Sequence, residues 1–183
     1  MRTSDKGICA LIQHEGIVPG PYKDSVGVWT YGIGHTAAAG APDPSNMDRG
    51  TPATLDDELM FIFDIFRDDL KKYEADVSKA FKSSLSQHQF DAAVSFHYNT
   101  GSISTATWVK TFNGGNPDKA ADQIMNWSKP DEIIPRRKAE QTLFRDGIYS
   151  DGIITVWGVS DKGKVKWTPM RTLSNQEALG LMD

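Results

Sequence analysis

Residues 17–36 restrict the fold more than any other segment, because glycine and proline interrupt them at short intervals. The breaking residues are Pro19, Gly20, Pro21, Gly27, Gly32 and Gly34. Both residue types disfavour the interior of a helix, so no helix of ordinary length fits here. The pieces between them, such as Val26–Trp29 and Thr30–Ile33, are rich in residues that favour strands. We therefore predict a small twisted β-sheet in this segment.

Patterns typical of helices lie on both sides of the predicted sheet. Ser4 can cap a helix that runs to about Glu15, and Gly16 follows at a natural stop. An apolar stripe after Thr54 predicts a long helix that ends near Phe81. Further helices are predicted from residue 86 to a stop at 99–101, and at about 104–112, 117–127 and 135–145. Residues 37–53 are rich in alanine, glycine, proline and aspartate and are expected to form a loop.

This order of elements predicts an α+β fold. A small β-hairpin lobe packs against a larger helical lobe, and a cleft between two such lobes suits a polymer substrate. Near the C-terminus, residues 153–168 alternate as strands do on either side of Asp161–Lys164, which predicts a second hairpin. We expect a main domain over residues 1–149 and an extension over 150–183. The extension should dock on the main domain, because an isolated hairpin is only marginally stable.

Composition excludes several classes of protein. The 183 residues carry a formal net charge of −4, so nothing indicates the basic surface of a nucleic-acid-binding protein. Cys9 is the only cysteine, which rules out an intramolecular disulfide and fits folding in a reducing cytoplasm. The first residues contain no apolar stretch typical of a secretory signal. Any attraction to an anionic partner must therefore be local, and two basic clusters are candidates: Arg136, Arg137 and Lys138, and Lys162, Lys164 and Lys166.

Two carboxylates and one hydroxyl form the most informative set of polar residues. Glu15 is predicted at the C-terminal end of the first helix, where the helix dipole disfavours its ionised form and favours a proton ready for donation. Asp24 is predicted in or beside the first strand, where a solvated carboxylate stays ionised. Thr30 lies six residues later on the next strand, so a hairpin brings its hydroxyl near Asp24. One acid, one carboxylate and one hydroxyl that holds water are the groups that glycosidic cleavage uses.

Other chemistries were weighed against this one. A solvated helix-end glutamate and a turn aspartate would need no catalytic role, and spacing alone favours that interpretation. Cys9 as a nucleophile is disfavoured because its helical neighbours are apolar. The four histidines, His14, His35, His88 and His97, show no spacing typical of a zinc site, so no metal and no cofactor is expected.

The segment from Glu15 to Thr36 resembles the active-site segment of the phage lysozymes, the T4-like and lambdoid endolysins. In that family a Glu, an Asp nine residues later and a Thr six residues after it form the catalytic set, as Glu15, Asp24 and Thr30 do here. The Gly-x-Gly-His signature that follows is matched by Gly32–His35. Residues 85–101 and 135–147 resemble the family's central core helix and its last catalytic-domain helix. The resemblance covers roughly residues 5–149.

The resemblance also suggests supporting residues. Arg136 takes the position of an arginine that pairs with the catalytic glutamate, although the adjacent Arg137 leaves the choice open by one residue. His35 and Thr36 would line the cleft, with a structural role favoured for His35. Tyr98 and Asn99 at the end of the central helix are candidates for sugar contacts, and core packing is an equal alternative for Tyr98.

The function that the resemblance implies is that of a lysozyme-like muramidase. Such an enzyme hydrolyses the β-1,4 bond between N-acetylmuramic acid and N-acetylglucosamine in bacterial peptidoglycan, with inversion expected, and thereby lyses the host cell. We expect a monomer made in the host cytoplasm and released through the membrane by a separate holin. The alternatives are a lytic transglycosylase, which needs one glutamate and no aspartate, and a catalytically silent wall-binding module on the same fold.

Overall fold

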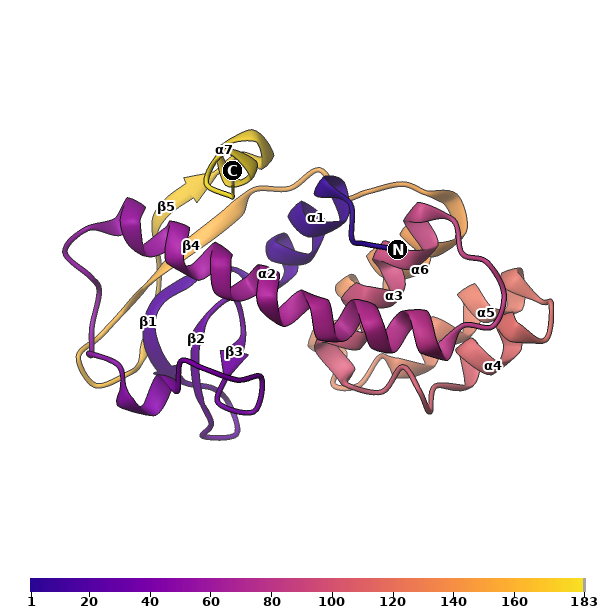
Figure 1. Ribbon diagram of the computed structural model, residues 1–183, viewed down its shortest axis with the longest axis horizontal. Coiled ribbons are helices and arrows are strands. Elements are labelled where there is room, and N and C mark those ends of the chain that lie inside the picture. The colour runs from indigo at the N-terminus through magenta and orange to yellow at the C-terminus, as the bar shows by residue number, and fades with distance from the viewer. Residues whose placement is uncertain (183) are drawn as a thin grey trace. The chain divides into compact units, whose positions relative to one another are not determined.

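A computed structural model describes residues 1–182 and divides the chain into two compact units. The helical unit contains residues 1–10 and 70–151, and the β unit contains residues 11–69 and the segment from residue 152 onward. Two helices begin in one unit and end in the other: α1 (Asp5–Glu15) and α2 (Leu55–Ala80). Figure 1 shows both helices, the sheet strands and the C-terminal hairpin. The predicted α+β class, with a helical lobe and a small β lobe, is confirmed.

The helical unit contains short helices that follow one another closely along the chain. They are α3 (Gln87–Thr100), α4 (Thr107–Asn113), α5 (Pro117–Ile124), the 3-10 helices η2 (Met125–Trp127) and η3 (Asp131–Ile133), and α6 (Ile134–Asp146). Their boundaries follow local signals that the sequence shows. Ser86 and Gln89 form a capping box at the start of α3, and Gly101 ends it in the left-handed conformation with φ of 64°.

Trp108 organises the core of the helical unit. Its side chain is fully buried, and its ring packs at 5.2 Å, centroid to centroid, against both Phe96 of α3 and Phe144 of α6. Phe81 packs on the same indole at 5.6 Å. The ring planes are tilted or nearly perpendicular, which is the geometry that the charge distribution of aromatic rings favours. These contacts join α3, α4 and α6 into one core.

The β unit contains two antiparallel sheets. The first consists of β1 (Val18–Lys23), β2 (Trp29–Gly32) and β3 (His35–Thr36), in that order. The second is the hairpin of β4 (Ile154–Val159) and β5 (Val165–Leu173). A 3-10 helix, η1 (Pro44–Asn46), interrupts the loop after β3, and a short helix, α7 (Asn175–Gly180), follows β5.

The C-terminal hairpin contacts β1 near both of its ends. At the first end, the backbone N–H of Ile17 donates to Thr155 O at 2.9 Å, and that of Trp157 donates to Ile17 O at 2.8 Å. At the other end, the N–H of Lys23 donates to Gly163 O at 3.0 Å. The side chains that point inward from the hairpin are fully buried, among them Ile154, Val156, Val159 and Leu173. The hairpin therefore contacts both ends of β1. The predicted docking of an extension on a domain over residues 1–149, and the boundary at residue 149, stay predictions.

Three features differ from the sequence predictions. Residues 26–28 form a turn, and β2 begins only at Trp29. The C-terminal hairpin continues to Leu173, five residues beyond the predicted end. Helix α7 was not predicted, although Ser174 and Glu177 form a capping box at its start and the Ser-x-x-Glu pattern is visible in the sequence. Among the described residues, no helix is both long and apolar enough to cross a membrane.

Truncation after Tyr149 is expected to destabilise the protein severely. It removes the buried side chains of Ile154, Val156, Val159 and Leu173, and burial of each such side chain contributes about 1.5–3 kcal/mol. The sum is comparable with the whole stability of a typical domain, about 5–15 kcal/mol. The truncated chain should melt far below the full chain in circular dichroism and should bind a dye for exposed apolar surface. Trp167→Ala in the full chain, a change at an exposed position of the same hairpin, should melt normally. Equal melting temperatures for the truncated and full chains would contradict the docking.

Candidate active site

Glu15 is the last residue of α1, and the chain turns sharply directly after it. Gly16 adopts φ of 68°, a conformation that glycine accepts easily. A side chain at Gly16 would also lie only 2.8 Å from Nε1 of Trp157, so the backbone approaches the C-terminal hairpin closely. Ile17 then enters its bridge with β4. Glu15 itself is half-buried, and its position is set by this turn.

Asp24 follows β1 directly and holds the turn between β1 and β2. Its Oδ1 accepts hydrogen bonds from the backbone N–H groups of Val26 at 3.0 Å and Val28 at 2.8 Å. Its own N–H donates to Val28 O at 3.0 Å, and Gly27 takes φ of 85° within the turn. These bonds explain why residues 26–28 are not a strand, because the carboxylate binds the N–H groups that a sheet would need. They also fix the orientation of the carboxylate.

Thr30 lies on β2 and is almost fully buried, with 4% of its surface exposed. Its Oγ1 donates to Val28 O at 3.2 Å, so the hydroxyl faces the same turn that Asp24 holds. In the sheet, Thr30 is paired with Tyr22 of β1 on one side and with Thr36 of β3 on the other. The prediction that Thr30 lies on the strand after Asp24 is therefore confirmed.

The phenol of Tyr22 is affected by the negative charges of both carboxylates. Burial raises the pKa of its phenol, and the negative charges of Glu15 and Asp24 raise that pKa further. Both carboxylates therefore lie within electrostatic reach of one hydroxyl, and Thr30 is the cross-strand neighbour of the residue that carries it. The convergence of Glu15, Asp24 and Thr30 on one catalytic site stays a prediction, which these two observations favour. Tyr22 was not singled out from the sequence, although it lies between the two carboxylates in the segment that carries the resemblance.

His35 is an internal support of the β unit. It is 2% exposed, and its Nδ1 lies 2.8 Å from Oδ2 of Asp69 in α2. Its Nε2 lies 2.9 Å from Pro42 O, in the loop after β3. These contacts hold the loop against the helix, which fits the structural role that the sequence favoured. The predicted cleft role of Thr36, which is half-buried on β3, stays a prediction.

The remaining predicted residues lie in the helical unit. Tyr98 packs on Tyr73 at 4.7 Å between ring centroids, which fits the packing alternative. The side-chain oxygen of Asn99 accepts a hydrogen bond from Arg137. Asn99 is nevertheless exposed, so its role in binding sugar stays a prediction.

Arg136 and Arg137 share one buried carboxylate in the helical unit. Nε of Arg136 donates to Glu140 at 3.0 Å, its terminal NH2 donates to Ser95 O at 3.0 Å, and Arg137 also pairs with Glu140. Both arginines are buried, so they are not the surface charges for wall binding that the sequence offered as candidates. Glu140 was missed, although its spacing of three and four residues from the arginines is the one that places side chains together on a helix. The pairing of Arg136 with Glu15 stays a prediction.

Cys9 and the candidate metal ligands are the residues on which other chemistries would depend. Cys9 is 1% exposed, and burial, together with the charge of Asp5, raises the pKa of its thiol to about 11. A thiol with so high a pKa is a poor nucleophile at neutral pH. Across residues 1–182, no group of three or more His, Cys, Asp or Glu side chains is arranged to hold a metal ion.

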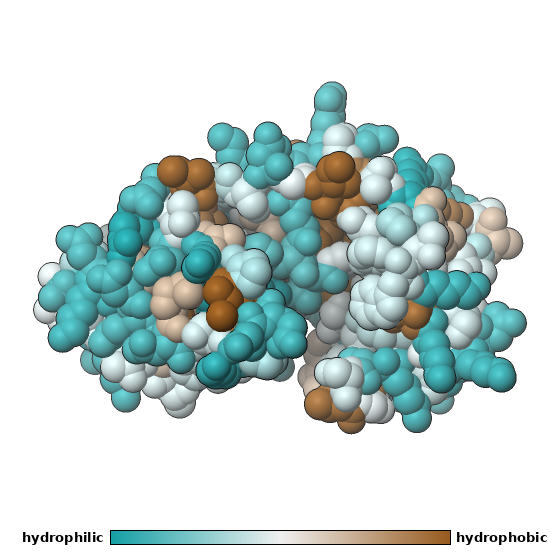
Figure 2. Space-filling view, turned by 180° about the vertical axis from the view of Figure 1, so that it is seen from behind, coloured by the Kyte–Doolittle hydropathy of each residue, from teal (hydrophilic) through white to brown (hydrophobic). Residues whose placement is uncertain are grey.

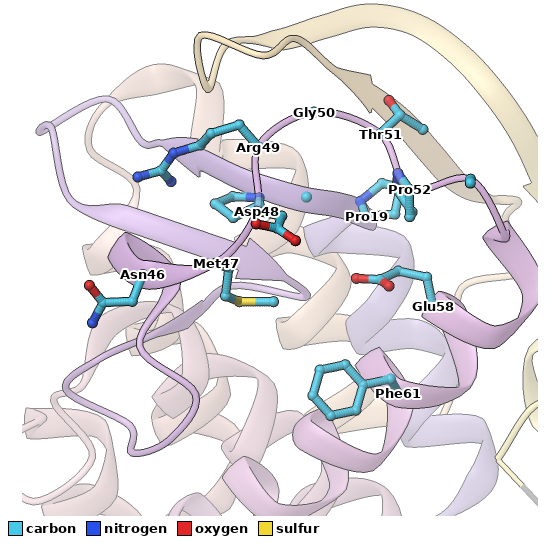
Figure 3. Close-up of a pocket in the computed structure, with 13 residues that line it drawn as sticks. Pro19, Asn46, Met47, Asp48, Arg49, Gly50, Thr51, Pro52, Glu58 and Phe61 are labelled. Carbon is cyan, nitrogen blue, oxygen red and sulfur yellow. The ribbon is translucent and has the colours of Figure 1, made fainter.

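A separate cavity of about 560 Å³ opens elsewhere on the β unit (Figure 3). It lies between Pro19–Pro21 of β1, the loop 46–53 and the first turns of α2, and the carboxylates of Asp48 and Glu58 face into it. Glu58 is already engaged, because it accepts a hydrogen bond from the Tyr31 hydroxyl. Glu15, Asp24 and Thr30 do not line this cavity, so it is distinct from the candidate active site.

Comparison with known proteins shows that the chain is similar to phage endolysins. The family model described as phage lysozyme matches residues 12–140. The endolysin of Salmonella phage P22 is 33% identical over 150 residues, which cover 79% of this chain and 98% of the relative. Among solved structures, the endolysin of Escherichia coli O157:H7 phage FAHEc1 aligns with a TM-score of 0.68 and 28% identity, over 82% of this chain and 97% of the other. A mutant of the P22 lysozyme aligns with a TM-score of 0.65 and 30% identity, over 79% and 98% of the two chains.

Two substitutions should separate the charge of Asp24 from its structural role, because its two hydrogen bonds need an acceptor oxygen but not a negative charge. Asp24→Asn keeps an oxygen acceptor for Val26 and Val28, so it should fold and melt as the wild type does. Asp24→Ala removes the acceptor and should destabilise the protein by about 1 kcal/mol, which lowers the melting temperature of a chain of this size by roughly 2–4 °C. Circular dichroism melts measure both, with Asp151→Ala, at an exposed position, as the control. Equal melting temperatures of Asp24→Asn and Asp24→Ala would contradict the proposed role of the Asp24 side chain in stabilising the turn.

Proposed function

This chain belongs to the phage lysozyme family, and we propose that it is a muramidase that hydrolyses the glycan strands of bacterial peptidoglycan. Family membership identifies a glycoside hydrolase in general. The finer proposal is that the enzyme cleaves the β-1,4 bond between N-acetylmuramic acid and N-acetylglucosamine. The observation that supports it is the turn after β1, where backbone amides hold the Asp24 carboxylate and the Thr30 hydroxyl faces the same turn, while the charges of both Glu15 and Asp24 act on Tyr22. Two carboxylates in different surroundings and a hydroxyl are the groups that this reaction needs.

Each residue has a distinct role in the proposed mechanism. Glu15, half-buried at the end of α1, donates a proton to the glycosidic oxygen as the bond breaks. Asp24, held by the amides of Val26 and Val28, positions a water molecule or stabilises the positive charge that develops on the sugar. Thr30 holds the water beside Asp24. Attack by this water on the opposite face of the sugar gives a product with inverted configuration.

The biological setting is proposed on the same basis. The enzyme is made in the host cytoplasm, acts as a monomer without a cofactor, and reaches the wall after a separate holin opens the membrane. Its action lyses the host cell.

Two measurements on the purified protein test the proposal. The first is the fall in turbidity of permeabilised Gram-negative cells, which a catalytically silent wall-binding module would not cause. The second is mass spectrometry of the released fragments. A muramidase leaves reducing N-acetylmuramic acid ends, whereas a lytic transglycosylase leaves anhydromuramic ends. Absence of lysis, or anhydro products, would overturn the proposal.

Glu15→Gln should abolish lysis while the fold stays intact. The amide has nearly the same shape but cannot donate the proton, and general acid catalysis contributes about 10²–10⁴-fold to the rate. The turbidity assay measures the loss, and circular dichroism confirms that the variant is folded. Glu132→Gln, the same change at an exposed position, is the matched control and should be fully active. More than about a tenth of the activity remaining in Glu15→Gln would show that Glu15 is not the general acid.

Thr30 should tolerate loss of its methyl group but not of its hydroxyl. Thr30→Ser keeps the oxygen near the Asp24 turn and should retain most activity, whereas Thr30→Ala removes it and should slow hydrolysis roughly tenfold or more, as loss of a group that orients a reactant does. Initial rates on purified sacculi measure both variants, with Thr172→Ala on the exposed side of β5 as the control. Full activity of Thr30→Ala would refute the proposed role in holding water.

A further inference from the structure

Trp167 is the most exposed of the large aromatic side chains in the C-terminal hairpin, with 76% of its surface accessible. Hydrophilic residues cover most of the face seen in Figure 2, and hydrophobic ones occur there in small separate groups. Single exposed apolar residues are ordinary on a protein surface. The surroundings of Trp167 are not ordinary, because three features of the hairpin converge on it.

The first feature is an interruption of the β-ladder that projects Trp167 outward. Trp157 of β4 is paired with Pro169 of β5, whereas the next residue, Gly158, is paired with Lys166. Trp167 and Thr168 therefore have no partner residue in β4 and form a bulge. Bulges re-aim side chains and are common beside functional sites.

The second feature is a rigid support for the exposed ring. Trp157 packs edge-on against Trp167, with ring centroids 5.6 Å apart and planes 70° apart. Trp157 is itself held against the backbone of Gly16. The indole of Trp167 is therefore oriented before any ligand arrives, which reduces the entropy lost on binding.

The third feature is a cavity of about 540 Å³ beside the ring, a volume within the range of small-ligand sites. Thr51 and Gly158 line one side, and residues 166–170 of the bulge line the other. The hydroxyls of Thr51 and Thr168 and the amine of Lys166 supply polar groups, while Pro169 and Met170 supply apolar surface. A flat aromatic ring with hydroxyls and an amine around it suits a pyranose, whose C–H face is apolar and whose edge carries hydroxyls.

Local charge favours an anionic polymer. Lys162, Lys164 and Lys166 are exposed on the hairpin, although the whole chain is acidic. Two acidic residues are near this surface: Asp56 pairs with Arg171, and Asp161 lies at the hairpin tip beside Gly50. The basic residues outnumber them. Peptidoglycan carries free carboxylates on its stem peptides, so its charge complements these lysines.

We propose that the bulge around Trp167 is an accessory binding site for a glycan strand of peptidoglycan, outside the active site. This inference rests on the proposed function for the identity of the polymer. A sugar ring stacks on Trp167, its hydroxyls contact Thr51, Thr168 or Lys166, and the carboxylates of the strand lie near the lysines. The site keeps the enzyme on the insoluble wall and takes no part in bond cleavage.

The test measures co-sedimentation with purified sacculi in the Glu15→Gln background, so that binding does not depend on hydrolysis. Trp167→Ala should weaken binding about tenfold, and Trp167→Phe should recover part of it because a flat ring remains. Met60→Ala, which removes another exposed apolar side chain of the β unit, is the matched control and should bind normally. With Glu15 intact, Trp167→Ala should slow lysis of sacculi but leave hydrolysis of a short soluble peptidoglycan oligosaccharide unchanged.

Several outcomes would overturn the inference. Equal binding of Trp167→Ala and its parent to sacculi would do so directly. If Trp167→Ala binds sacculi normally but no longer forms a dimer in analytical ultracentrifugation, the partner of Trp167 is a second copy of the chain. If it binds sacculi normally but no longer binds anionic lipid vesicles, the partner is a membrane surface. Failure of the proposed function is distinguishable, because it would appear as absence of lysis by the Glu15-containing protein while Trp167-dependent binding persisted.

Discussion

Backbone hydrogen bonds near the two ends of β1 constrain the whole candidate active site. The C-terminal hairpin supplies both: β4 pairs with Ile17, two residues after Glu15, and Gly163 at the hairpin tip accepts from Lys23, one residue before Asp24. The strand between these anchors is six residues long. Fixing both ends of β1 limits the spacing between the residues that carry the two carboxylates, although the pairing of β1 with β2 is irregular between Val18 and Tyr22. The hairpin therefore supports the segment that the proposed chemistry uses, although it lies far away in the sequence.

The contact between the hairpin tip and β1 depends on the close approach of the Gly163 backbone to the ring of Trp29. A side chain at Gly163 would lie 2.6 Å from the ring of Trp29, and Gly163 takes φ of 68°. The indole of Trp29 is held in turn by the guanidinium of Arg49, 3.7 Å from its centroid, in a cation–π contact. Glycine is required at this contact because any other residue would push the hairpin tip away from the strand and adopt a strained backbone. Trp29 thus links the start of β2, the hairpin tip and the loop after β3.

The sequence predicts those parts of the structure that depend on neighbouring residues. The cap at Ser4, the stop at Gly16 and the helix start at Ser86 depend on contacts within one helical turn, and all were found near their predicted positions. The predicted strand at residues 26–28 was wrong because a single carboxylate, Asp24, binds the backbone N–H groups of Val26 and Val28 and outweighs the strand preference of these valines. Glu140 could have been found from its spacing of three and four residues from the two arginines, whereas the effect of both carboxylates on Tyr22 appears only in three dimensions.

The hairpin has two faces with different physical roles. The inward side chains of β4 are buried against β1 and contribute stability, whereas five consecutive residues of β5, Lys166–Met170, are exposed. An exposed tryptophan in such a position stabilises the fold little, since its apolar surface remains in water. Pro169 has no N–H to donate to the ladder, which accounts for the irregular pairing beside it. The exposure of Trp167 at that bulge is what the proposed binding of a ligand explains. An enzyme acting on an insoluble polymer gains from a second contact with that polymer, because the first contact raises the local concentration for the other. The two faces together let one hairpin brace the active-site strand and hold the enzyme on its substrate.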